Sequence, residues 1–477
     1  MSDPAWTNLP IKTAASDALR KNTGDCKWEA TSSKTADPNK CNLTMADLIG
    51  VNSSGQEKEN VESKFSSLRE PDRVCVVLNG HGKLGSVYTQ VARILARQGG
   101  WKRKKTTTGR FHMVFGEAGG VGIPFKRFSQ VFRYDYGIKP LVNYNRNCKS
   151  ITDKAMLTQT LVKYFGENKF SDENKFLPET FLFWPGRDEV SQHLLFQTSF
   201  KRNIGGNIWI VKPCNESHGK GIFLSSDYDE IIDHINSQPD GSKPWLVQRY
   251  VENPVLLRGG RKFDMRIWVL LTHDFKVYIH REGVIRTSSV TYDTSDLRNK
   301  FIHMTNHSIQ EEHEDFGKHE EGNEIFFENF HRSNIFEEDI SLEEDILPQV
   351  KDIVRETFLA AKPVLEKIEE IDDYHSFMFF GFDFIVDSNS KVWLIEVNAS
   401  PAVAKPLLPK VAADIIKTAI DPIFPRPNCS DSQESDFELV FESKGNCGYV
   451  ANMPAPETLE DVEIESFGQQ ESVTRKK

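Results

Sequence analysis

The stretches FGFDFIVD, residues 380–387, and WLIEVN, residues 393–398, decide the fold of this chain. Both are runs of aliphatic and aromatic residues with few interruptions. Between them, Ser388, Asn389 and Ser390 are typical of a turn. The pattern predicts a buried β-hairpin, in which side chains alternate between the two faces of each strand.

The polar residues of this hairpin predict a cation site. Alternation places Glu396 and Asn398 on one face, and a loop at 388–391 places Asp383 opposite Glu396. Two neighbouring carboxylates are costly to bury unless a cation lies between them. Oxygen ligands of this kind suit Mg²⁺ rather than Zn²⁺. The alternative is a pair of solvent-facing polar residues on a half-exposed sheet, which the apolar flanks disfavour.

A charged stripe precedes this hairpin in the sequence. In RKFDMRIW, residues 261–268, Lys262, Asp264 and Arg266 share one face, and apolar residues occupy the other. Residues 261–272 and 275–287 are expected to form a second hairpin around His273 and Asp274, with Arg286 on the partner strand. Guanidinium groups can bind carboxylate or phosphate with two hydrogen bonds. The stripe therefore indicates an anion-binding surface, the alternative being a salt-bridged, solvated face.

A lysine at the end of a third apolar segment indicates a phosphate contact. Lys212 ends NIWIVK, residues 207–212, and the loop that follows contains Gly219 and Gly221. A lysine that leaves a buried strand beside such a loop can reach a phosphate while loop amides cover it. By itself this pattern is weak, and it gains weight only from the other two.

Composition separates a compact part from two tails. Of the 477 residues, 38% are hydrophobic and 32 are Phe, which indicates folded domains with real cores. Residues 1–70 are rich in Ser, Thr, Asn and Lys, and residues 426–477 hold 11 Asp/Glu against 5 Lys/Arg. Both ranges are expected to be mostly disordered. Between them, strand and helix patterns predict an α/β or α+β core in three parts, at 71–151, 152–249 and 250–425.

The remaining composition disfavours several classes of protein. No apolar run reaches the ~18 residues of a membrane span, and the first residues lack the parts of a secretory signal. Seven Cys without a CxxC pair indicate reduced thiols rather than a disulfide framework or zinc site. The net charge of −10 argues against a general nucleic-acid binder. The basic run WKRKK, at 101–105, is expected to be solvated, or else to attract an acidic partner.

Eight segments, in their order along the chain, resemble the tubulin–tyrosine ligase family. They are KPLVNY at 139–144, WIVK at 209–212, RKFDMRIW at 261–268, REGVIRT at 281–287, MTNH at 304–307, HEEGNE at 319–324, FGFDFIVD at 380–387 and WLIEVNASPA at 393–402. The resemblance covers about residues 74–425. It implies an ATP-grasp fold in three parts, with the nucleotide between the central and C-terminal parts. It also implies ATP and Mg²⁺ as cofactors, with K⁺ as a further possibility.

The resemblance implies roles for individual residues, carried over by motif position. The implied Mg²⁺ ligands are Asp383, Glu396 and Asn398, in agreement with the hairpin argument. The implied nucleotide contacts are Lys154, Lys212, Gln248, Arg249, Tyr250, Val251, Lys262, Asp264, Thr305 and Asn306. Among these, Arg249 and Val251 are expected to meet the adenine through their backbone. The implied catalytic residues, on the phosphate and acceptor side, are Lys262, Asp264, Arg266 and Arg286.

The reaction that the resemblance implies is ATP-dependent formation of an amide bond. The expected reaction joins free tyrosine to the C-terminal glutamate of detyrosinated α-tubulin through an acyl phosphate. The enzyme is expected to be a cytoplasmic, cytoskeleton-associated monomer without nucleic-acid or membrane partners. One alternative is a relative that adds glutamate or glycine to tubulin side chains, although the acidic end of this chain favours tyrosine. A non-catalytic tubulin-binding protein would be expected to lose a metal ligand.

Overall fold

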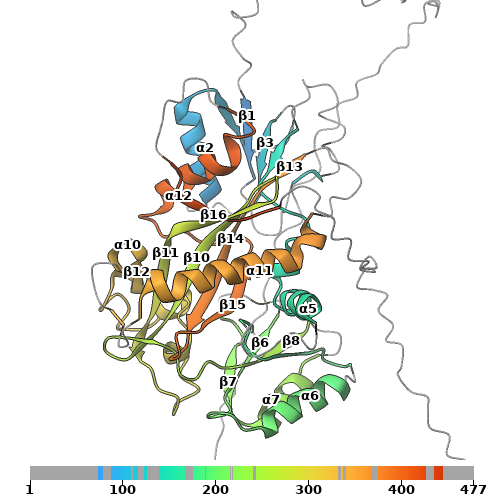
Figure 1. Ribbon diagram of the computed structural model, residues 1–477, viewed down its shortest axis with the longest axis vertical. Coiled ribbons are helices and arrows are strands. Elements are labelled where there is room, and N and C mark those ends of the chain that lie inside the picture. Colours follow the sequence, from blue (N-terminus) through green and yellow to red (C-terminus); the bar gives the residue numbers. More distant parts are fainter. Residues whose placement is uncertain are drawn as a thin grey trace, which may run out of the picture. The chain divides into compact units, whose positions relative to one another are not determined.

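Three sheets form the framework of the part of the chain that the computed structural model describes (Figure 1). That part comprises residues 73–78, 87–108, 111–116, 123–125, 128, 139–166, 176–187, 190–214, 216, 219–239, 243–330, 335–336, 340–366, 374–425 and 434–443. All of it falls within one unit, Glu70–Lys477. The ranges expected to be disordered lie outside it, apart from 434–443. None of the described helices combines the length and the apolarity needed to cross a bilayer.

The largest sheet is antiparallel and carries both predicted hairpins. Its order is β12-β11-β10-β14-β15, with β9 paired to β10 and β16 paired to β11. The strands are β9 (Leu256–Leu257), β10 (Arg261–Leu271), β11 (Lys276–Thr291), β12 (Glu324–Phe326), β14 (Met378–Val386), β15 (Val392–Asn398) and β16 (Phe437–Glu442). Because β10 lies beside β14, the charged stripe and the carboxylate hairpin are neighbours in one sheet.

The apolar face of this sheet packs against a long helix. The β10 residues Phe263, Met265 and Ile267 are buried in the main core, as the alternation predicts. Helix α11 (Leu347–Leu365) crosses this face of the sheet in Figure 1, and the ring of its Phe358 lies 5.6 Å from that of Phe380. A π-helical turn, Leu342–Ile346, leads into the helix. The opposite face of β10 is thereby left for the charged side chains.

A smaller antiparallel sheet faces these charges. Its order is β5-β8-β6-β7, and its members are β5 (Thr180–Phe183), β6 (Trp209–Pro213), β7 (Phe223–Ser225) and β8 (Trp245–Arg249). Helices α6 (Val190–Lys201) and α7 (Tyr228–Asn236) lie together beside it, at the bottom of Figure 1. They share a core with it that includes Phe196, Trp209 and Ile231.

The third sheet is parallel and draws on distant parts of the sequence. Its order is β13-β4-β3-β1-β2, and its members are β1 (Arg73–Val77), β2 (Trp101–Lys104), β3 (Met113–Phe115), β4 (Leu141–Val142) and β13 (His375–Ser376). Helix α2 (Val87–Gln98) packs against α12 (Leu408–Ile415), which continues into a π-helical turn, Ile416–Ile420. The expected first part, 71–151, thus shares its sheet and its helix layer with the expected C-terminal part.

Short helices connect the sheets around the charged face. From the third sheet, α4 (Lys149–Thr152) and α5 (Lys154–Phe165) lead toward β5. After β11 come α8 (Lys300–His303), α9 (His307–Gln310), a 3₁₀ turn at Glu321–Asn323 and, beyond β12, α10 (Phe327–Phe330). Asp153 caps α5 by accepting hydrogen bonds from the N–H groups of Ala155 and Met156, which fixes the position of Lys154.

Strand β16 corrects the expected end of the compact part at residue 425. It lies in the acidic range and pairs antiparallel with β11. The ring of Phe437 is buried, 4.9 Å from the ring of His280 and 6.5 Å from that of Phe379. Its sequence, FELVFE, holds enough apolar residues for a strand. The average composition of the acidic range conceals so short a segment.

A cluster of titratable side chains lies where β16 meets the core. His280, Asp414 and Asp436 each offer one ligand atom within 4.8 Å of the others. Nδ1 of His280 accepts the N–H of Glu282 at 3.0 Å, and Nε2 lies 3.2 Å from an Asp414 carboxylate oxygen. The contact between His280 and Asp414 connects β11 with α12.

Candidate active site

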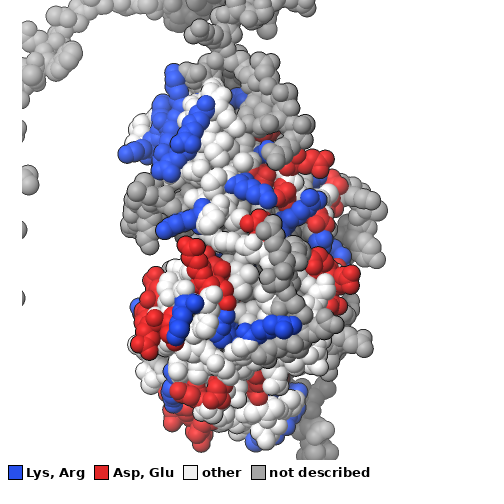
Figure 2. Space-filling view, turned by 90° about the vertical axis from the view of Figure 1, so that its left-hand side faces the viewer, with Lys and Arg blue, Asp and Glu red and all other residues white. Residues whose placement is uncertain are grey.

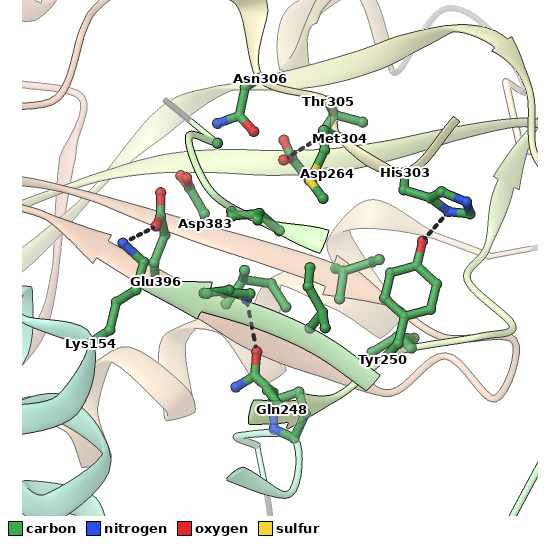
Figure 3. Close-up of a pocket in the computed structure, with 18 of the residues that line it drawn as sticks. Lys154, Gln248, Tyr250, Asp264, His303, Met304, Thr305, Asn306, Asp383 and Glu396 are labelled. Atoms are coloured by element: carbon green, nitrogen blue, oxygen red, sulfur yellow. Dashed lines mark hydrogen bonds and ion pairs between the residues drawn. The ribbon is translucent and has the colours of Figure 1, made fainter. Parts of the chain in front are cut away.

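A cavity of about 910 Å³, counted out to its opening, lies between the two antiparallel sheets. Residues of β6 and β8 form one side, and residues of β10, β11, β14 and β15 form the other (Figure 3). All ten expected nucleotide contacts line it, together with Arg286, Asp383 and Glu396. The remaining two expected site residues, Arg266 and Asn398, do not line it, but both hydrogen-bond to Asp383.

The charged side chains on the large sheet form two rows across its strands. In the first row, Glu324, Arg286 and Asp264 face one another on β12, β11 and β10. In the second row, Arg266, Asp383 and Glu396 do so on β10, β14 and β15. Directly opposed residues share one face of a sheet, so all six side chains lie on the same face. Arg286, Asp264, Asp383 and Glu396 line the cavity, and Arg266 and Glu324 lie beside them without lining it.

Asp383 is the centre of this cluster. Arg266 donates to both of its oxygens, at 2.7 and 2.6 Å, and Nη2 of Arg286 donates at 3.0 Å. Arg286 also holds both oxygens of Asp264, at 2.6 and 2.7 Å. The pairing of Asp383 with Glu396 is as predicted, although it depends on a register shift between Asp383 and Phe384 that the sequence did not reveal.

The donor set at this end of the cavity fits a magnesium ion. Nδ2 of Asn398 lies 3.3 Å from an Asp383 oxygen and 3.1 Å from a Glu396 oxygen. A half-turn of that amide presents its oxygen in place of the nitrogen, giving three oxygen-bearing groups in one place. Burial alone would raise the pKa of Glu396, but the charges of Lys154 and Arg266 lower it to about 2. The carboxylate is therefore ionised and available as a ligand.

Two buried lysines point to an anion beside this cluster. Nζ of Lys212 donates to Gln248 at 2.9 Å, and Nζ of Lys262 donates to the Tyr250 hydroxyl and to the His303 carbonyl, both at 2.8 Å. All three partners are neutral. Burial lowers the pKa of Lys212 to about 8 and that of Lys262 to about 7. A phosphate in the cavity would restore the favourable charge environment that burial removes.

Beside Tyr250, the cavity is lined by His303 and by apolar side chains that were not among the expected site residues. The Tyr250 hydroxyl lies 3.0 Å from Nδ1 of His303 (Figure 3). Nε2 of His303 lies 3.0 Å from the Asp296 carbonyl. Apolar side chains complete the lining there, namely Ile210, Ile222, Met304, Ile385 and Ile395. Side chains two residues apart on a strand share a face, so Ile385 lies on the same face as Asp383, and Ile210 on the same face as Lys212. No pattern in the sequence singled out His303.

Arg249 and Gly219 also have clear positions. The guanidinium of Arg249 donates to Glu179 at 3.2 and 3.0 Å and lies over the ring of Trp209, which leaves its backbone for the cavity. Gly219 has φ +72°, and a Cβ there would lie 2.5 Å from the side chain of Ile309 and 3.6 Å from that of Asn306. A glycine therefore lets the loop after Lys212 approach the residues that follow β11.

The architecture is consistent with the ATP-grasp fold, in which two antiparallel sheets enclose a nucleotide. A model of the tubulin–tyrosine ligase family matches residues 136–433, more than half of the chain, so the protein belongs to that family. The resemblance in the sequence motifs is thereby confirmed.

Curated relatives add information about the kind of activity. The chain is 35% identical over 233 residues to tubulin glycylase 3D of Tetrahymena thermophila, a match that covers 45% of this chain and 21% of the relative. It is 30% identical over 279 residues to the probable tubulin polyglutamylase ttll-9 of Caenorhabditis elegans, covering 57% and 64%. It is 29% identical over 331 residues to the probable alpha-tubulin polyglutamylase Ttll1 of T. thermophila, covering 64% and 76%. The chain thus spans about a fifth of the length of the glycylase.

Proposed function

We propose that this protein is an ATP- and Mg²⁺-dependent ligase that joins an amino acid to a carboxylate of tubulin. The observation that carries the proposal is the cavity itself. It places Lys212 and Lys262, whose hydrogen-bond partners are neutral, beside an oxygen-rich cluster of Asp383 and Glu396. Family membership supports the same reading.

The chemistry follows from what this arrangement can stabilise. A carboxylate cannot expel oxide, so transfer of the γ-phosphoryl group of ATP to the acceptor carboxylate makes an acyl phosphate and ADP. An amine then attacks the acyl carbon, and phosphate leaves as the amide bond forms. Positioning and charge neutralisation supply most of the catalysis in such a sequence. No side-chain nucleophile is required.

Each predicted site residue has a place in this scheme. Lys154, Lys212 and Lys262 bind phosphate oxygens, and Thr305 and Asn306 lie at the γ-phosphate. Gln248, Tyr250 and the backbone of Arg249 and Val251 hold the adenine against the apolar end of the cavity. Arg286, which is paired with Asp264, stabilises the reacting carboxylate. Arg266 acts indirectly, because it holds Asp383 in position.

Asp383, Glu396 and Asn398 are the groups that would hold Mg²⁺. A magnesium ion bound there neutralises phosphate charge, which is the chemistry that two carboxylates and an amide beside a nucleotide suit. The possibility of K⁺ stays a prediction from the family resemblance. The expectation of a monomer likewise stays a prediction.

We infer that the amino acid added is glycine or glutamate rather than the tyrosine expected from the sequence. The curated relatives described above are named as glycylases and polyglutamylases, and the matches cover 45%, 57% and 64% of this chain. We therefore adopt the alternative reading given by the family resemblance, in which the amino acid is added to tubulin side chains. Transfer of tyrosine to a C-terminal glutamate becomes the alternative.

The charge distribution supports an acidic protein partner. From residue 73 to residue 116 the sequence contains no Asp or Glu, although the whole chain has a net charge of −10. The edge strand β2 exposes Lys102, Arg103 and Lys104. Figure 2 shows a group of Lys and Arg side chains in the upper part of the molecule, where Figure 1 places α2. Tubulin tails are acidic, so this surface favours their approach, and the enzyme is expected to associate with the cytoskeleton.

Mass spectrometry of tubulin tests the proposal directly. Tubulin, both tyrosinated and detyrosinated, is incubated with the full chain and MgATP in three separate reactions, with glycine, glutamate or tyrosine. A mass increase of one or more glycine or glutamate residues, mapped to tail side chains, is the expected result. Addition of a single tyrosine to detyrosinated tubulin only would restore the tyrosine assignment. Absence of any ATP-dependent addition, with tubulin still bound, would favour a non-catalytic binding protein.

A further inference from the structure

Glu324 lies on the same face of the large sheet as the charged cluster, and its carboxylate has no hydrogen-bond or ion-pair partner in the part of the chain that the structure describes. Asp264, Asp383 and Glu396 each pair with a cation, respectively Arg286, Arg266 and Lys154. Glu324 stands at the end of the first row, directly opposite Arg286. Among the described residues, no hydrogen bond or ion pair holds its carboxylate. The Nε and Nη2 groups of Arg286 already donate to Asp264, and those of Arg266 already donate to Asp383.

The loop that carries Glu324 is fastened tightly to β11. Glu320 is paired with Arg261 and accepts a hydrogen bond from Thr287 at 3.0 Å. Nδ2 of Asn323 donates to the Thr287 carbonyl and to the Ser289 hydroxyl, each at 3.0 Å. Asn323 is buried and has φ +54°, a conformation that non-glycine residues adopt at a cost. The loop thus fixes the position of the half-buried Glu324 carboxylate, which accepts no hydrogen bond from the described residues.

The environment of Glu324 suits a cationic ligand. Burial raises the pKa of its carboxyl group, against the charges of His307, Arg286 and Arg266. A carboxylate that is half-buried and unpaired gains most from a ligand that brings its own charge and hydrogen-bond donors. An ammonium group has both properties.

The place of Glu324 identifies which ammonium group this is. The proposed function places the adenine at Gln248 and Tyr250, whereas Arg286 donates hydrogen bonds to Asp264 and Asp383 in the carboxylate-rich part of the site. An amine that attacks an acyl phosphate formed there must approach on the same side. We propose that Glu324 binds the α-ammonium group of the amino-acid donor and positions it beside Arg286. The inference rests on the proposed function but holds for glycine, glutamate and tyrosine alike, because all three carry this group.

The test compares the full chain with its Glu324→Gln, Glu324→Asp and Glu321→Gln variants. Glu321 is an exposed carboxylate of the same loop and serves as the matched control. Loss of a charge-assisted hydrogen bond should raise the KM for the amino acid by about 10- to 100-fold in Glu324→Gln, with the KM for ATP unchanged. Glu324→Asp keeps the charge and should show a smaller increase. Glu321→Gln should match the wild type.

Hydroxylamine separates recognition of the donor from every other role of Glu324. It is largely uncharged at neutral pH, and its attack on an acyl phosphate releases phosphate and gives a hydroxamate. Glu324→Gln should therefore form hydroxamate at the wild-type rate while its use of the amino acid is impaired. A parallel loss of both reactions, or an unchanged KM for the amino acid, overturns the inference. A wild-type protein that forms neither amide nor hydroxamate overturns the proposed function and this inference with it. The melting temperature of each variant shows whether it is folded. If Glu324→Gln is not, the KM of Glu324→Asp for the amino acid decides whether the inference holds.

Discussion

At the scale of single residues, the site is an arrangement of charges that are only partly compensated. Arg266 and Arg286 neutralise Asp383 and Asp264, whereas Lys212 and Lys262 are buried against neutral partners. Burial of these two lysines is unfavourable, and the nearby carboxylates Glu396 and Asp264 offset only part of its cost. Binding of an anion would offset the cost of burying the charged forms of Lys212 and Lys262.

Glu396 gives the most direct residue-scale prediction. Glu396→Gln removes one charge at nearly constant volume, so Mg²⁺-dependent ligation should fall by at least about 100-fold while folding persists. Steady-state rates at several Mg²⁺ concentrations, with melting temperatures, measure both effects. Glu312→Gln, at an exposed carboxylate paired with Lys300, is the control and should behave as the wild type. Near-normal turnover of Glu396→Gln would exclude its role as a ligand.

The buried lysines predict how nucleotide affinity depends on pH. With pKa values of about 7 for Lys262 and about 8 for Lys212, both are charged at low pH and lose their protons as pH rises. Bound phosphate favours the charged forms. Affinity for ATP should therefore fall above pH 7, by up to about tenfold per pH unit for each lysine, and binding should take up protons.

Calorimetry in buffers of different ionisation enthalpy measures that proton uptake. Lys262→Met should reduce it and flatten the pH dependence near pH 7. Lys163→Met, on the exposed side of α5, should leave it unchanged. Equal proton uptake by Lys262→Met and the wild type would assign the titration to another group.

At the scale of elements, β16 shows that the acidic range contributes to the core. Its Phe437 fills a space beside His280 and Phe379, whereas Leu439, two residues on, is 46% exposed. The strand also covers the outer edge of the first part of β11. The core therefore extends beyond residue 425.

This difference within β16 gives a stability prediction. Phe437→Ala should lower the free energy of unfolding of the full chain by about 3–5 kcal/mol, because it leaves a cavity in the core. Leu439→Ala should change it by less than about 1 kcal/mol. Urea unfolding followed by circular dichroism measures both. A chain ended after residue 443 should resemble the full chain, whereas one ended after residue 425 should melt at a lower temperature; equal melting would show that β16 is dispensable.

At the scale of the whole molecule, a protein of net charge −10 must attract an acidic tail through local positive surfaces. Exposed contacts are screened over a Debye length of about 8 Å at physiological salt, while enclosed contacts are screened less. The KM for tubulin should therefore rise with added salt, and that for ATP should change less. Reversing Lys102, Arg103 and Lys104 to Glu should raise the KM for tubulin further and weaken its salt dependence.

The control for that variant carries three reversals on α11, at Lys351, Arg355 and Lys362. If it affects tubulin use as strongly as the variant in β2, net charge and not the local surface is responsible. A salt-independent KM for tubulin would show that apolar or enclosed contacts hold the acceptor.

The sequence by itself determined the two hairpins and the charged face of β10, and its resemblance to the family predicted many of the residues that line the cavity. The hairpins and the charged face depend on local alternation, which a strand imposes wherever it lies. Only the tertiary structure decided that β10 lies beside β14, that β13 and α12 complete the first sheet and its helix layer, and that His303 and Glu324 adjoin the site. Those relations join residues distant in sequence, and pairing across a sheet leaves no local periodic pattern to mark it. The register shift beside Asp383 and the core position of Phe437 were hidden for the same physical reason, because each depends on a partner strand that packing selects.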